Sequence, residues 1–300
     1  MPFSIPESET DPMTVILENT PSRYALWHRF VHQNLSVVVG GVLLLSVILI
    51  ALVGPIVYAV DPNAISPLRR LKPPSSLYWF GTDALGRDLF ARVIAGGRVS
   101  LLVGVSVSVL SLACGILFGL VSGFFRSVDA IMSRVLEAFM AIPAVLLAIA
   151  LMALTTASVG NVIIALTISE IPRVTRLMRS VVFTLRGQPF VEAAIASGAP
   201  IPHVLFRHIL PNTLAPLIVQ GTFICGSAII VESILSFIGA GTPSSVPTWG
   251  NIIADGRTFF QIYPHMIFFP AVFLSITVLS INLIGDGLRD YLDPRMARNM

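Results

Sequence analysis

The amino-acid sequence predicts an all-α integral membrane protein, and two observations carry this prediction. The chain has 300 residues, of which 55% are hydrophobic and only 12% are charged, whereas soluble domains carry about 25% charged residues. It also contains six apolar stretches, each close to the roughly 20 residues that a helix needs to cross the hydrocarbon of a bilayer. Their approximate ranges are 35–60, 99–124, 135–154, 162–182, 214–238 and 266–284.

The first stretch, residues 35–60, is predicted to be an uncleaved transmembrane helix. It is longer than the about 7–15 apolar residues of a secretory signal. The preceding residues 1–34 begin with a polar segment rich in Pro and Glu, which is typical of a partly disordered tail.

The loop 61–98 that follows is predicted to contain a short amphipathic helix on the outer membrane surface. Prolines keep its first half extended. Asp88 and Arg92 stand four residues apart, where an ion pair stabilises a helix, and apolar residues share the opposite helical face. These apolar residues are Leu85, Leu89, Phe90, Val93 and Ile94. An ordinary solvated loop is the alternative.

Residues 99–287 are expected to form the core domain, with the other five transmembrane helices. Gly115, Gly119 and Gly123 repeat every four residues in the second span. This spacing predicts a smooth groove that another helix approaches closely.

Two prolines are expected to kink transmembrane helices, because proline removes a backbone hydrogen bond that neighbouring helices must replace. Pro143 lies in the third span and Pro172 in the fourth. The fourth span is also the weakest, since Glu170 and Arg173 interrupt it.

Six spans place both termini on one side of the membrane, and the basic residues indicate the cytoplasmic side. That side, including the tail 288–300, would hold twelve arginines, whereas the outer side would hold seven basic residues. The outer loop is an exception to this bias, because six of the seven lie in it. The twelve are Arg23, Arg29, Arg126, Arg134, Arg173, Arg176, Arg179, Arg186, Arg207, Arg289, Arg295 and Arg298; the seven are Arg69, Arg70, Lys72, Arg87, Arg92, Arg98 and Arg257.

A polar stretch at about 184–212 is predicted to project from the cytoplasmic side as a helix–turn–helix. Residues 189–196 favour a short helix, Gly198 favours a turn that a bulkier residue would resist, and 200–208 favour a second short helix. This shape suits docking of another protein. A purely structural loop explains the pattern equally well.

The same stretch resembles the EAA loop of binding-protein-dependent ABC importers. The matching residues are Glu192, Ala193 and Ala194, then Gly198, and further on Leu210 and Pro211. The resemblance implies that this loop inserts into a cleft of an ATPase subunit and transmits its movement. His208, where the family pattern favours Ile, and the prolines Pro200 and Pro202 depart from the pattern.

Four further stretches resemble the C-type permease of dipeptide, oligopeptide and nickel importers. They are Phe80–Asp88, Arg207–Asn212, Glu232–Gly239 with Pro247–Asn251, and Gly285–Asp290 with Asp293–Arg295. The resemblance implies the bacterial inner membrane, a B-type permease partner, two ABC ATPase subunits and an extracytoplasmic solute-binding protein. It also implies that this chain binds no cofactor, because the ATPase subunits use the ATP and Mg²⁺.

Glu170 and Glu232 lie within predicted spans, where a charged residue costs about 2.5–3.5 kcal/mol. Glu170 has Arg173 three residues on, so an intrahelical pair is the simplest account. Glu232 is a candidate for the translocation path, binding a substrate amine, or for a latch between neighbouring helices.

Several functional classes are disfavoured by what the chain lacks. A P-loop ATPase needs a lysine, and the one lysine is Lys72, in the outer loop. A hydrolase needs a nucleophile beside a base, a metalloenzyme needs clustered ligands, and nucleic-acid binding needs a basic block. A self-sufficient channel or carrier has no use for a docking loop. The sequence therefore predicts a non-catalytic importer subunit for peptides, with nickel complexes, glutathione or another small solute as alternatives.

Overall fold

The computed structural model describes residues 35–292, and the regular structure in this range is helical apart from one isolated β-bridge, Thr82 to Asp88. The longer helices are α3 (Leu35–Val57), α4 (Leu89–Phe124), α5 (Arg126–Met140), α7 (Val159–Arg186), α10 (Leu210–Phe237) and α12 (His265–Leu292). The shorter ones are α6 (Ala144–Ala153), α8 (Pro189–Ala196), α9 (Ile201–His203), α11 (Trp249–Gly256), two 3₁₀ turns at Pro67–Arg69 (η1) and Arg257–Phe259 (η3), and a π-helical segment at Val204–Ile209 (η2).

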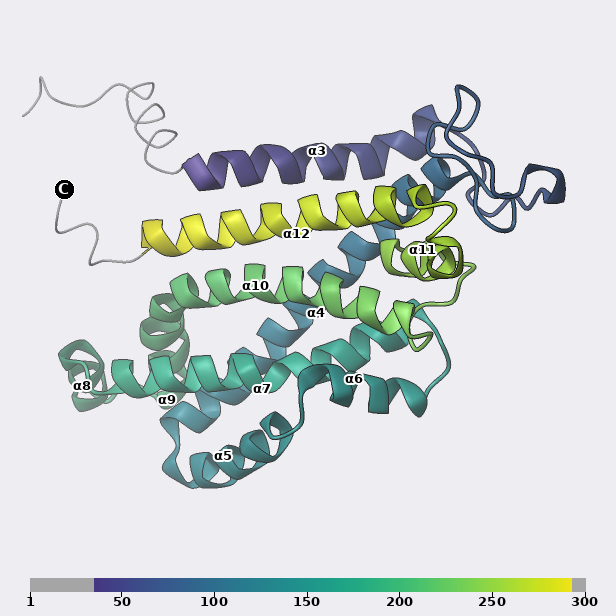
Figure 1. Cartoon of the computed structure of the whole chain (residues 1–300). Helices are drawn as coiled ribbons and strands as arrows, with labels where there is room; N and C mark the ends of the chain where they lie inside the picture. The colour runs from purple at the N-terminus through teal and green to yellow at the C-terminus, as the bar shows by residue number, and fades with distance from the viewer. Residues whose placement is uncertain (1–34, 293–300) are drawn as a thin grey trace, which may run out of the picture.

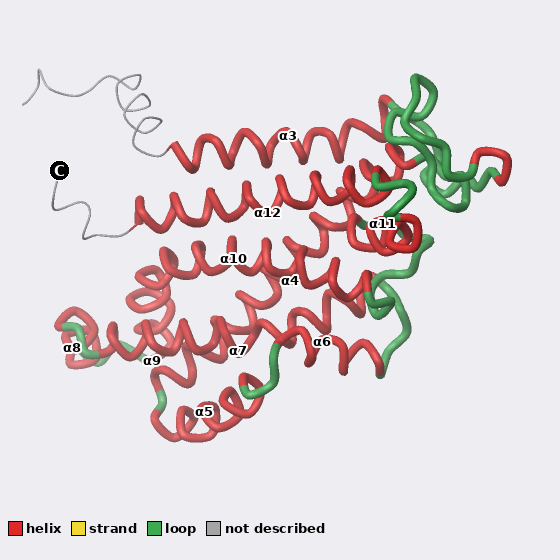
Figure 2. The backbone as a smooth tube through the Cα atoms, in the orientation of Figure 1, coloured by secondary structure: helices red, strands yellow, loops and turns green. Residues whose placement is uncertain are grey.

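The long helices lie side by side and define two opposite ends of the molecule (Figure 1). One end holds α8, the first turn of α3 and the last turn of α12; we call it the α8 end. The other holds α11 and the loop between α3 and α4; we call it the α11 end. Figure 2 shows that this loop is almost entirely non-helical.

Within residues 35–292, four helical segments are long and apolar enough to cross a membrane: α3, α4, the run Ile201–Phe237 and α12. The pair α5 and α6 passes the same test as one segment, although it is bent by 84°. Helix α7, which contains the fourth expected span, is not among them, because Glu170, Arg173, Arg176 and Arg179 interrupt its apolar sequence. Four or five membrane-spanning candidates are therefore present, and a sixth remains a prediction.

The expected third span, 135–154, is not one helix. α5 ends at Met140 and α6 begins at Ala144, with Pro143 in the capping position. Proline disfavours a helical conformation in the residue before it. The helix therefore ends before Pro143 and a new helix begins after it, instead of one helix with a gentle bend. Pro172 behaves differently, because α7 runs through it without interruption.

The prediction of a separate amphipathic helix within 61–98 is wrong. The helix that begins at Leu89 continues to Phe124, and Asp88 caps it by accepting a hydrogen bond from the Ala91 N–H, 3.1 Å away. Neither a proline nor a capping sequence stops it after Ile94. Leu89 and Val93 are fully buried in the protein instead of lying on a membrane surface.

The groove predicted along α4 is confirmed, and α7 fills it in the most extensive helix–helix contact of the described chain. A Cβ added at Gly119 would lie 2.5 Å from the Met178 Cβ, closer than real Cβ contacts come. The other two glycines are equally tight: Gly115 meets Val174 at 2.5 Å and Gly123 meets Val182 at 2.7 Å. Only glycine permits this approach of the two backbones.

Candidate functional site

The α8 end carries a short helix that closes in a Schellman motif. Pro189 occupies the first turn of α8, where a missing N–H costs nothing. After the helix, the Gly198 N–H donates to the Ile195 carbonyl and the Ala199 N–H donates to the Ala194 carbonyl, at 3.0 and 3.1 Å. Gly198 has φ +81°, the left-handed conformation that this motif requires and that glycine adopts without strain. The expected turn at Gly198 is confirmed.

One face of α8 packs on the bundle and the other faces outward. Val191 is fully buried, and Ala194 and Ala199 pack against the same core. Glu192 and Ala193 are exposed. So are two large apolar side chains of the same helix, Phe190 at 42% and Ile195 at 47%. Ile201, 43% exposed, follows beyond the turn in α9. The outward face therefore combines apolar side chains with one carboxylate.

The second helix of the expected helix–turn–helix is not separate. Helix α9 continues through the π-helical segment into α10, so Leu210 and Pro211 belong to the first turn of α10 and not to a loop. The Leu210 N–H donates to the Leu205 carbonyl, five residues back. Proline clashes with the carbonyl four residues before it, and the wider π turn relieves that clash at Pro211. The turn at Gly198 is thus joined to α10 without a flexible linker.

Glu232 lies fully buried in the last two turns of α10. Its Oε1 accepts hydrogen bonds from Ser236 at 2.8 Å, Thr248 at 2.9 Å and Thr242 at 3.4 Å. Its Oε2 has no hydrogen-bond partner among the described residues. Thr248 caps α11, with its hydroxyl and the Asn251 side chain bonded reciprocally to each other's backbone N–H. The carboxyl group therefore ties α10 to the turn at 242–248 and to the start of α11.

Glu170 forms the expected pair within α7. Its Oε2 lies 3.2 Å from Nη1 of Arg173, and its side chain is 8% exposed against 52% for Arg173. The structure places this pair on a different helix from Glu232.

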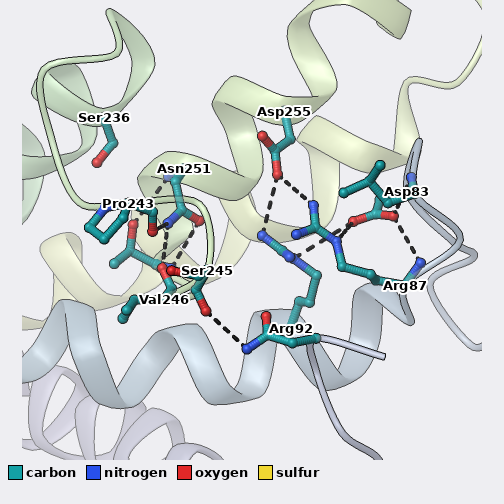
Figure 3. Close-up of polar contacts among 12 residues, drawn as sticks. Asp83, Arg87, Arg92, Ser236, Pro243, Ser245, Val246, Asn251 and Asp255 are labelled. Atoms are coloured by element: carbon teal, nitrogen blue, oxygen red, sulfur yellow. Dashed lines mark hydrogen bonds and ion pairs between the residues drawn. The ribbon is translucent and has the colours of Figure 1, made fainter. Parts of the chain in front are cut away.

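Sequence reasoning missed a cluster of two buried arginines, one buried aspartate and one partly exposed aspartate, Asp255, at the α11 end (Figure 3). Arg87 bridges Asp83 and Asp255, with N–O distances of 2.5 and 2.9 Å. Arg92, which is fully buried, reaches Asp255 at 3.3 Å. The four-residue spacing had suggested that Arg92 pairs with Asp88, but Arg92 pairs with Asp255 instead. Asp255 follows Arg92 by 163 residues, so no local pattern pointed to it.

A second contact fixes the same loop to α3. The Tyr58 hydroxyl, just after α3, donates to Asp88 Oδ2 over 2.7 Å. Burial, and next this hydrogen bond, raise the pKa of Tyr58 to about 12. Tyr58 therefore stays protonated and remains a donor to the α4 cap at physiological pH.

Two family models match the chain. The model described as "Binding-protein-dependent transport system inner membrane component" matches residues 115–298. The model described as "N-terminal TM domain of oligopeptide transport permease C" matches residues 20–74. Together they match the N-terminal part of the chain, including α3, and the C-terminal part from within α4 onward.

Curated relatives match nearly the whole chain. A probable peptide ABC transporter permease protein, y4tQ, of Sinorhizobium fredii is 51% identical, covering 90% of this chain and 92% of its own. The dipeptide transport system permease protein DppC of Alkalihalophilus pseudofirmus is 39% identical over 98% and 97%. The oligopeptide transport system permease protein OppC of Bacillus subtilis is 38% identical over 89% and 88%. The chain therefore belongs to the binding-protein-dependent ABC transporter permeases, inner-membrane proteins of many spans, and within them to the C type.

Proposed function

We propose that this chain forms half of the translocation path of a peptide importer and is itself not catalytic. In this proposal it pairs with a B-type permease, two ABC ATPase subunits bind ATP and Mg²⁺ at the cytoplasmic face, and a solute-binding protein delivers the substrate from outside. The relatives named above for dipeptide, oligopeptide or peptide transport support a peptide substrate.

The observation that carries the proposal is the outward face of α8. Glu192, Ala193 and the apolar side chains beside them are exposed, yet their backbone is held firmly by the Gly198 motif and by the unbroken path into α10. A rigid, exposed, partly apolar helix suits insertion into a cleft of another protein. Because α10 also carries Glu232, movement of α8 would reach the α11 end through one helical run.

Six crossings with both termini cytoplasmic remain part of the proposal. The first turn of α3, the last turn of α12 and α8 lie at the same end (Figure 1), which fits an even number of crossings if α7 and the bent α5–α6 pair each cross. The six basic residues of the outer loop, which run against the orientation signal, are also partly accounted for. Arg87 and Arg92 are paired internally, and Arg98 donates to the Ala51 and Leu52 carbonyls at 2.7 and 2.6 Å. Pro55 lacks the N–H that the Ala51 carbonyl would otherwise bind.

We further propose that Glu232 is a helix latch rather than a ligand for a substrate amine. Its three donors come from this chain and its side chain is fully buried. Glu170 is proposed to be a locally paired residue of α7, without a direct contact to substrate.

Uptake by the reconstituted complex tests the proposed function. Proteoliposomes containing both permeases and the ATPase subunits should accumulate a labelled peptide in the lumen. Accumulation should require ATP in the lumen, on the side of the ATPase subunits, and binding protein outside. The ligand released from the binding protein, identified by mass spectrometry, should be a peptide. If the released ligand is a nickel complex or glutathione, the proposed substrate changes to that solute. Uptake by this chain without ATPase subunits would contradict the proposed function.

A further inference from the structure

Three cations of the outer loop, Arg69, Arg70 and Lys72, form no ion pair within residues 35–292, although Arg69 lies over the Tyr78 ring. Arg87, Arg92 and Arg98 bind groups of this chain, as described above. Arg69, Arg70 and Lys72 are exposed. Exposed basic residues outside the membrane oppose the usual orientation signal, so this group calls for a function that requires positive charge.

These cations belong to a turn, residues 68–72, which we call the basic turn. It begins in η1, which Figure 2 draws as the single short helix in the loop at the α11 end, pointing away from the long helices. Leu68, at its tip, is 92% exposed. Among the acidic residues of 58–88, Asp61 is exposed, whereas Asp83 and Asp88 are buried. The surface is therefore a positively charged projection with an apolar tip.

The basic turn is held rigidly by the segment 82–84. The Leu71 N–H donates to the Asp83 carbonyl at 3.1 Å, and Lys72 N–H donates to the Thr82 hydroxyl at 2.8 Å. Arg70 Nε donates to the Ala84 carbonyl at 2.6 Å. Asp83 is in turn a member of the ion cluster that reaches Asp255 of α11.

Leu71, in the middle of the turn, has φ +54°, the one non-glycine residue with positive φ in the described chain. Such a conformation is unfavourable for leucine and persists only where the surroundings enforce it. The fold thus maintains a strained backbone to hold Leu68 and the cations outward. A preordered surface loses little conformational entropy on binding, which favours a recognition role over an ordinary loop.

We propose that the basic turn is a docking surface for an acidic, partly apolar patch of the solute-binding protein, an inference that rests on the proposed function. The cations would steer and orient the acidic partner, and Leu68, flanked by Arg69 and Arg70, would fill an apolar pocket at the centre of the contact. The projection of the turn away from the helices favours a soluble protein over the lipid surface as the occupant.

The test measures binding of the liganded solute-binding protein to the full complex in nanodiscs at several salt concentrations. Arg69→Gln/Arg70→Gln/Lys72→Gln should raise Kd about tenfold at low ionic strength and flatten its dependence on salt. Leu68→Ala should raise Kd about fivefold or more and leave the salt dependence as in the wild type. Arg134→Gln, which removes an exposed cation from α5, is the matched control and should bind as the wild type does.

Each variant is first checked for intact assembly with the ATPase subunits, so a folding defect is recognised. Wild-type Kd and salt dependence in the triple variant would overturn the docking inference. The same result accompanied by loss of bound anionic lipid would assign the basic turn to lipid and also overturn it. If the wild-type complex binds no solute-binding protein, the proposed function fails instead.

Discussion

Replacing Gly119 by valine is expected to prevent stable packing of α4 against α7 and to remove the subunit from the assembled complex. The added Cβ would lie 2.5 Å from the Met178 Cβ and 3.0 Å from the Thr175 carbonyl oxygen. Neither atom is the free end of a flexible side chain, so the helices must separate. Overpacking of this kind costs about 1–3 kcal/mol and occasionally more. Thermal unfolding of the purified complex, with the yield of assembled subunit, measures the effect.

Gly41→Ala on α3 is the matched control, because no atom of residues 35–292 lies within 4 Å of a Cβ added there. It should leave stability and yield close to wild type. Normal assembly and an unchanged unfolding temperature in Gly119→Val would show that the α4–α7 contact is not the packing that holds this bundle together.

Replacing Glu232 by leucine is expected to release the 242–248 turn from α10. The three hydroxyl groups that donate to Oε1 would lose their acceptor in a fully buried site. Each buried polar group left unsatisfied costs about 1–3 kcal/mol. Reduced thermal stability and reduced assembly with the partner permease should follow.

Glu232→Gln separates the latch from the alternative role. Glutamine keeps one carbonyl acceptor for the same donors, so the latch account expects assembly and much of the transport to survive. If Glu232 instead bound a substrate amine, the glutamine variant would lose uptake while assembling normally. A leucine variant with full stability and uptake would contradict both roles.

The sequence predicted well those features that depend on neighbours along the chain. Apolar length identified the long helices, a four-residue glycine repeat identified the α4–α7 groove, and Gly198 identified the end of α8. Each signal reflects a property of one helix or one turn. A helix end formed by a left-handed glycine, or a groove formed by missing side chains, can therefore be recognised in the sequence without knowledge of the fold.

Features that depend on distant partners were not predicted. The spacing of Asp88 and Arg92 suggested an ion pair, but the cap of α4 uses Asp88, and Arg92 binds Asp255 of α11. The extent of α4 was misjudged because an amphipathic pattern over two turns does not reveal that the helix continues. Thr242 and Thr248, which complete the Glu232 site, likewise become its neighbours only through the turn before α11.

The most direct test of the central claim is retention of the ATPase subunits by variants of α8. Valine at Gly198, where φ is +81°, is strained although space is free around it. Gly198→Val should therefore distort only the exposed turn, and Glu192→Ala should remove only an exposed carboxylate. Gly160→Val, at a position with an open surrounding near the start of α7, serves as the matched control.

In pull-downs from membranes, both α8 variants should insert and retain the partner permease but lose the ATPase subunits, or hydrolyse ATP without uptake. Because the ATPases are cytoplasmic, loss of their binding by these substitutions also places the α8 end on that side. Wild-type ATPase retention together with wild-type uptake in both variants would contradict the account and remove the coupling role from α8.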